Sequence, residues 1–136
     1  MLGQVHDQVA VYGSGGFTTY DDRRLDEQLA HWVDTERIPR VKIKIGEDRG
    51  QRVDRDLARM RQARARIGDD RQLFVDANGA YGVAQAIRVM HRAADAHVVW
   101  FEEPVTSDDL DGLRTVRNAV AADVAAGEYG WDLWSL

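Results

Sequence analysis

Five short runs of β-forming residues alternate along the chain with four stretches whose apolar residues recur at helical spacing. The expected strands are 9–12, 41–45, 73–77, 98–101 and 124–126. The apolar positions of the expected helices are Leu25, Leu29, Trp32 and Val33, then Val53, Leu57, Met60 and Ile67, then Val83, Ile87, Met90 and Ala94, and last Leu110, Leu113 and Val116. Strands that alternate with helices form parallel βα units, so the sequence predicts an α/β fold with about five parallel strands.

The segments between these elements give more local expectations. Gly13-Ser14-Gly15-Gly16 is expected to form a loop after the first strand, and Thr106 or Ser107 is expected to cap the fourth helix. Residues 131–136 are expected to start one more helix. The helix over 53–67 carries Arg and Asp residues between its apolar positions, which we interpret as a solvated surface.

Length and composition limit the classes of protein that the chain can belong to. At 136 residues we expect one domain, 1–136, and the net charge of −5 argues against nucleic acid or anionic membranes as partners. The absence of cysteine excludes disulfides and thiolate metal sites, and four scattered histidines do not form a zinc site. No apolar run approaches the roughly 18 residues of a membrane span, and no signal-peptide pattern is present, so we expect a cytoplasmic location.

Only two of the 18 basic residues are lysines, and both lie in the second expected strand, as Lys42 and Lys44. Residues two apart share a face of a strand, so these lysines point the same way. Arginine stays protonated at any working pH, whereas lysine can lose its proton, so the pair favours chemistry over surface charge. The alternative is that the lysines protect an edge strand from aggregation.

Carboxylates occur at the ends of three successive strands. Asp76, Glu102 and Glu128 follow one another at intervals of 26 residues, the length of one βα unit, and Asn78 shares the face of Asp76. Ligands bind at the carboxyl ends of strands in parallel α/β folds. Singly, each carboxylate could be a helix cap or a surface group. Together they would repel one another without a cation, and Mg²⁺ is the usual hard cation for such oxygen ligands.

A metal ion opposite a lysine suits the removal of a proton α to a carboxylate group, because the ion stabilises the negative charge that develops. Lys44 would be the base. Lys42, roughly 6.6 Å away along the strand, would lower the pKa of Lys44 by repulsion and could also contact the substrate carboxylate.

Four motifs resemble the mandelate racemase branch of the enolase superfamily, within the mandelate racemase/muconate lactonizing enzyme family. They are Lys42-Ile43-Lys44, Val75-Asp76-Ala77-Asn78-Gly79-Ala80-Tyr81, Trp100-Phe101-Glu102-Glu103-Pro104 and Ala126-Gly127-Glu128. The resemblance implies Asp76, Glu102 and Glu128 as Mg²⁺ ligands, Lys44 as an acid/base and Asn78 beside the ligands or the substrate. It implies an isomerase or lyase, a racemase or acid-sugar dehydratase acting on a small α-hydroxy acid or acid sugar. Glu103 faces the other way by strand alternation and is not counted as a ligand.

The same resemblance implies a partial (β/α)8 TIM barrel. The N-terminal capping domain and the last barrel strands of the family, with their His–Asp dyad or further lysine, are missing from the 136 residues. His31, His91 and His97 are expected to be structural. We therefore expect the isolated chain to be inactive or nearly so, with open barrel edges that permit self-association.

Two other function classes stay open. The first is a non-catalytic, doubly wound module in which Gly13-Ser14-Gly15-Gly16 cradles a phosphate or the acidic residues bind a metal, although no Lys-Ser/Thr follows the glycines. The second is a decayed fragment that has no function.

Overall fold

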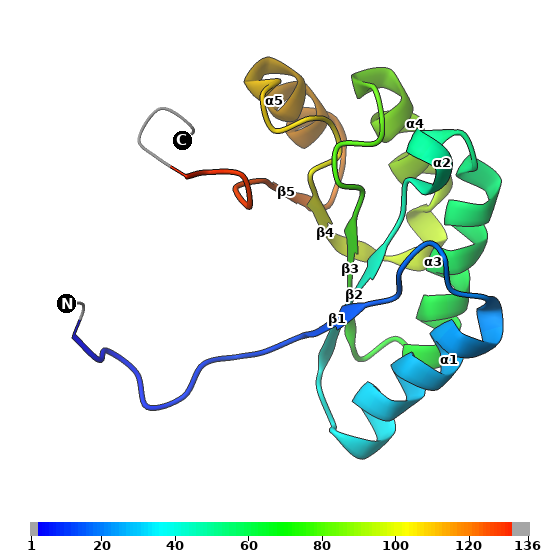
Figure 1. Cartoon of the computed structure of the whole chain (residues 1–136), viewed down its shortest axis with the longest axis vertical. Helices are drawn as coiled ribbons and strands as arrows, with labels where there is room; N and C mark the ends of the chain where they lie inside the picture. Colours follow the sequence, from blue (N-terminus) through cyan, green and yellow to red (C-terminus); the bar gives the residue numbers. More distant parts are fainter. Residues whose placement is uncertain (1–2, 132–136) are drawn as a thin grey trace.

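Five parallel strands form one sheet in the order of the chain, β1-β2-β3-β4-β5 (Figure 1). The computed structural model describes residues 3–131. The strands are β1 (Gly13–Gly15), β2 (Arg40–Lys44), β3 (Gln72–Asp76), β4 (Val98–Glu102) and β5 (Asp123–Ala125). The predicted parallel α/β fold is confirmed. A sequential strand order is that of a barrel wall, whereas the strand order of a doubly wound sheet reverses direction.

The helices lie along one face of this sheet (Figure 1). They are α1 (Asp22–Ala30) with the π-helical turn η1 (His31–Thr35), α2 (Glu47–Gly50), α3 (Val53–Ile67), α4 (Val83–Arg92) with the 3-10 turn η2 (Ala94–Ala96), and α5 (Leu110–Ala119). Asp109, rather than Thr106 or Ser107, caps α5, because its carboxylate accepts the Gly112 N–H at 2.9 Å. Within residues 3–131 no helix combines the length and hydropathy needed to cross a membrane. The helix expected at 131–136 lies outside the described residues, except for Trp131.

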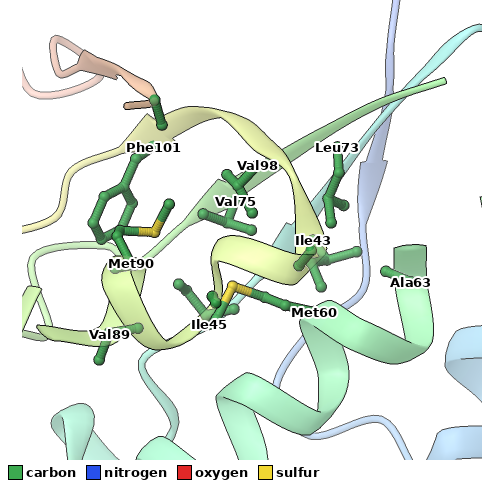
Figure 2. Packing of buried hydrophobic residues seen from close by; sticks show 14 of the residues in the cluster. Ile43, Ile45, Met60, Ala63, Leu73, Val75, Val89, Met90, Val98 and Phe101 are labelled. Carbon is green, nitrogen blue, oxygen red and sulfur yellow. The ribbon is translucent and has the colours of Figure 1, made fainter. Parts of the chain in front are cut away.

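The two faces of the sheet differ in chemistry because side chains alternate along each strand. The helix-facing side carries the fully buried residues Val41, Ile43, Leu73, Val75 and Phe101. Figure 2 shows four of them, Ile43, Leu73, Val75 and Phe101, packed with the methionines Met60 of α3 and Met90 of α4 in one apolar core. The opposite face carries two rows set by the strand register. One row pairs Lys42 with Phe74 and Trp100, and the next pairs Lys44 with Asp76 and Glu102.

The first strand differs from the prediction. The segment 9–12 has no strand pairing and exposes Val9 and Val11, and three of the four residues expected to form a loop, Gly13–Gly15, are β1 itself. Glycine is required at position 13 of this strand, because a Cβ atom there would lie 2.4 Å from the Trp32 ring. The Gly16 amide donates to the Gln28 side chain at 2.7 Å, so this N–H is already bonded within the protein.

The charged side chains of α3 also differ from the prediction, which placed them on a solvated surface. Asp56, Arg59 and Arg64 are buried. The Arg59 guanidinium donates to three carbonyl oxygens of the segment 16–20 at 2.5–3.2 Å. The Arg64 guanidinium donates to four carbonyl oxygens within 68–97 at 2.6–3.1 Å. A guanidinium carries five donors in a fixed geometry, so each of these arginines can hold several loop carbonyls at once.

The Gly13→Ala variant tests the contact between β1 and Trp32. We expect it to lower the free energy of unfolding by about 1–3 kcal/mol, because the new methyl group overlaps a packed ring. Urea unfolding followed by circular dichroism measures the change. Gly3→Ala is the control, since nothing lies within 4 Å of a Cβ atom there. Equal stability of the two variants would contradict this account of β1.

Candidate functional site

The candidate site lies at the carboxyl ends of β2, β3 and β4, on the face of the sheet opposite the helices. The strand register places Lys44, Asp76 and Glu102 side by side as the last residues of their strands. Glu128 follows β5 at the same end of the sheet. The structure therefore brings together the lysines and carboxylates that the sequence singled out.

Both lysines are paired with carboxylates. Lys42 Nζ lies 2.7 Å from each carboxylate oxygen of Glu102 and 3.5 Å from Asp76 Oδ2, while Lys44 Nζ pairs with the same Asp76 oxygen. Asp76 is fully buried, so its charge depends on these two cations. Burial alone lowers the pKa of Lys42, but the hydrogen bond and charge of Glu102 outweigh it and raise the pKa above its ordinary value. Lys42 is therefore a permanent cation of the site.

The acidic side chains form a set of oxygen donors of suitable size for a metal ion. One oxygen from each of Asp76, Glu102 and Glu128 lies within 4.8 Å of the others. Asn78 is hydrogen-bonded to two of these carboxylates. Its backbone N–H donates to Asp76 at 3.0 Å, and its side-chain amide donates to Glu128 at 3.2 Å. Hard oxygen donors at this spacing fit Mg²⁺.

Glu103 is the site residue that strand alternation missed. Strand β4 ends at Glu102, and Glu103 adopts a left-handed φ of 40°, so alternation no longer sets its direction. Its side chain is buried, and its Oε1 atom has no hydrogen-bond partner in the described part of the chain. Burial raises the pKa of the Glu103 carboxyl, and the charges of Glu128, Asp76 and Glu102 raise it further. In the sequence, the only signal was a second acidic residue directly before Pro104.

A second group missed by the sequence holds the loops around the site. The Tyr81 hydroxyl donates to Asp56 at 2.7 Å, and the Glu47 amide donates to the same carboxylate at 3.2 Å. Asp56 is on α3, Glu47 follows β2, and Tyr81 follows β3, so one buried carboxylate joins the loops that follow Lys44 and Asp76. Burial raises the pKa of Tyr81, and the charge of Asp56 adds to the effect.

The histidines lie elsewhere. His97 directly precedes β4, and His91 lies 3.0 Å from the carbonyl oxygen of Ala119, ahead of β5. Both are therefore at the amino ends of the strands, opposite the candidate site. His31 pairs with Glu36 at 3.4 Å in the segment that follows α1.

An open cavity of about 710 Å³ lies beside Lys44. Its wall includes Phe17 and Thr18 from the loop after β1, Arg49 from α2 and Asn78 from the loop after β3. A cavity of this volume admits a small organic acid next to the Lys44 side chain.

The family described as enolase C-terminal domain-like matches residues 24–136. The chain belongs to this family. It is 34% identical over 128 residues to D-galactarolactone cycloisomerase of Agrobacterium fabrum, a match that covers 93% of this chain and 33% of that enzyme. The chain spans about a third of the length of the curated relatives that it matches.

Solved structures agree with this assignment. A mandelate racemase/muconate lactonizing enzyme-like protein from Rubrobacter xylanophilus is 46% identical, with a TM-score of 0.87 over 96% of this chain and 36% of that one. A racemase from Streptomyces coelicolor with bound magnesium is 29% identical, with a TM-score of 0.81 over 88% of this chain and 32% of that one. The predicted membership of the enolase superfamily is confirmed, and the five strands correspond to part of its TIM barrel.

The Lys44→Met variant tests whether Lys44 and a metal ion compete for Asp76. Without metal, we expect the variant to lose about 2 kcal/mol of unfolding free energy, because buried Asp76 keeps only Lys42 as a partner. Mg²⁺ should then stabilise the variant more than it stabilises the wild type, because no ammonium group competes for the carboxylate. Urea unfolding with and without MgCl₂ measures both effects.

Arg88→Met is the matched control, since it removes an exposed cation from α4. It should change neither the stability nor the response to Mg²⁺. An equal gain from Mg²⁺ in Lys44→Met and in the wild type would contradict the competition.

Proposed function

We propose that this chain carries the magnesium ligands and one acid/base of a site that removes the proton α to a carboxylate group. The observation that carries the proposal is the row of Lys44, Asp76 and Glu102 at the strand ends, with a Glu128 oxygen within 4.8 Å of the other carboxylates. In this proposal Asp76, Glu102 and Glu128 hold Mg²⁺, and Lys44 is the acid/base.

The chemistry divides between the ion and the lysines. A bound Mg²⁺ would bind the substrate carboxylate and stabilise the negative charge that develops on it. Lys44 Nζ receives the proton from the α-carbon, which requires that Lys44 first leave Asp76 and lose its own proton. Lys42 stays protonated beside Glu102 and supplies a fixed positive charge at the site.

The relatives limit the reaction class. They are named as a cycloisomerase, acid-sugar dehydratases and epimerases. We propose an α-hydroxy acid or an acid sugar as the substrate, bound in the cavity beside Lys44. Whether the product is an isomer or a dehydrated acid depends on the group that acts on the opposite face of the substrate carbon.

Self-association is a separate part of the proposal. Strands β1 and β5 each pair on one side only among the described residues, and Tyr12 and Trp100 on the helix-free side are 44% and 37% exposed. Unpaired parallel edges and exposed aromatic rings favour pairing with further chain, and a second copy could supply it. Association through these edges stays a prediction.

Mg²⁺ binding is the first test of the proposal. At a concentration 100 times its dissociation constant, Mg²⁺ should stabilise the 136-residue chain by about 2.7 kcal/mol. The Glu102→Gln variant should abolish this gain, whereas Glu36→Gln, which changes an exposed carboxylate beside His31, should keep it. Thermal unfolding at increasing MgCl₂ concentration gives the shifts. No shift in the wild type, or an equal shift in Glu102→Gln, would overturn the metal site.

Proton exchange tests the role of Lys44. We expect the 136-residue chain to show little or no net conversion of galactarate or mandelate, because the described acid/base candidate, Lys44, acts on one face only. A single base still removes a proton and returns a deuteron in D₂O, so slow exchange of the α-hydrogen should be visible by NMR. Exchange should require Mg²⁺ and disappear in Lys44→Met but not in Arg88→Met. Exchange that persists in Lys44→Met would overturn this role.

A further inference from the structure

Glu103 has two energetically unfavourable features. The roles proposed above for the metal ligands and for Lys44 do not explain them. Its carboxylate is 1% exposed, yet its Oε1 atom has no hydrogen-bond partner among the described residues. Its backbone has a left-handed φ of 40°, a conformation that non-glycine residues rarely adopt. A buried polar atom without a hydrogen-bond partner and a strained backbone both destabilise a protein, and such features persist mainly at functional sites.

The backbone of Glu103 is fixed between two neighbouring loops of the site. Its N–H donates to the Ala125 carbonyl oxygen at 2.8 Å, and its own carbonyl oxygen accepts the Gly79 N–H at 2.8 Å. Ala125 ends β5 ahead of Glu128, and Gly79 follows Asn78. The residue therefore sits between the segments that carry Glu128 and Asn78, and its position does not depend on the side chain.

The charges of the cluster do not balance. Glu103 directly follows Glu102, and its backbone is hydrogen-bonded to the segments that lead to Glu128 and Asn78. The three carboxylates of Asp76, Glu102 and Glu128 already outnumber the two lysines before Glu103 is counted. A divalent cation supplies the missing charge.

Glu103 is not one of the three side chains whose oxygens lie within 4.8 Å of one another. It is therefore placed outside the direct ligand set. Mg²⁺ keeps several of its water molecules when it binds to proteins, and carboxylates outside the first ligands accept hydrogen bonds from ligands of the ion. A water molecule on the ion would supply the donor that Glu103 Oε1 lacks.

We propose that Glu103 is a positioning residue of the metal centre, whose carboxylate accepts a hydrogen bond from water bound to the divalent cation. This inference rests on the metal site of the proposed function and adds a fourth carboxylate to it. The role explains why the strained, unpaired side chain is held beside three other carboxylates rather than turned toward solvent.

The Glu103→Gln variant of the full 136-residue chain tests the inference. Its dissociation constant for Mg²⁺, measured by isothermal titration calorimetry, should rise roughly 10- to 100-fold. The Tm of the metal-free variant should be equal to or higher than that of the wild type, because the substitution removes an unpaired buried carboxyl group and keeps the volume. A residue with a merely structural role would show the opposite pattern, a lower metal-free Tm and an unchanged dissociation constant.

Two further variants calibrate this result. Asp108→Asn removes one negative charge from an exposed side chain of the same loop and should leave Mg²⁺ binding unchanged. Glu102→Gln removes a direct ligand and should abolish binding. A loss in Glu103→Gln as complete as that in Glu102→Gln would make Glu103 a direct ligand and overturn the inference.

The remaining outcomes separate this inference from the proposed function. Unchanged Mg²⁺ binding in Glu103→Gln, with binding lost in Glu102→Gln, would overturn the role of Glu103 and leave the metal site intact. A variant that fails to fold, or has a lower metal-free Tm, would show a structural role and overturn the inference. No Mg²⁺ binding by the wild type would overturn both proposals.

Discussion

The rest of the site depends on the pairing of a fully buried carboxylate, Asp76, with two lysines of the adjacent strand. An ionised carboxylate away from water is costly without a cation, so the register that brings Lys44 beside Asp76 is favoured. A slip of one residue between β2 and β3 would turn the lysines into the apolar core under the helices. The ion pairs therefore fix the register of the sheet as well as the place of the site.

The same pairing sets the relation between stability and function. Without metal, the lysines occupy the carboxylates that a divalent cation would use, so the cluster is satisfied internally except at Glu103. In the proposed function, a bound divalent cation would supply part of that neutralising charge, and Lys44 would then no longer be needed as the partner of Asp76. The ion pair between Lys44 and Asp76 would in that case hold the proposed base in place until the cation binds.

Much of this arrangement follows from residue order alone. Strand alternation and the even spacing of Asp76, Glu102 and Glu128 predict the sheet and the gathering of polar residues at one end. The position of β1 does not follow, because the close approach of Gly13 to Trp32 is a contact between separate segments that a periodic pattern does not contain. The direction of Glu103 does not follow either, since a single left-handed φ ends the alternation. Long-range contacts and single dihedral angles are what a periodic pattern leaves out.

The row of Lys42, Phe74 and Trp100 lies next to the row of carboxylates. It explains how one side of the site is buried while the other is open to solvent. The rings of Tyr12, Phe74 and Trp100 form a continuous aromatic row with centroids 5.6 and 5.8 Å apart, and Lys42 Nζ lies 5.3 Å from the centre of the Tyr12 ring. These rings keep water from the lower side, which is why Lys42 is buried and its charge is tied to Glu102. Glu128 on the upper side is exposed. The lower side of the site therefore holds a buried cation, whereas the upper side is open at Glu128 and at the cavity beside Lys44.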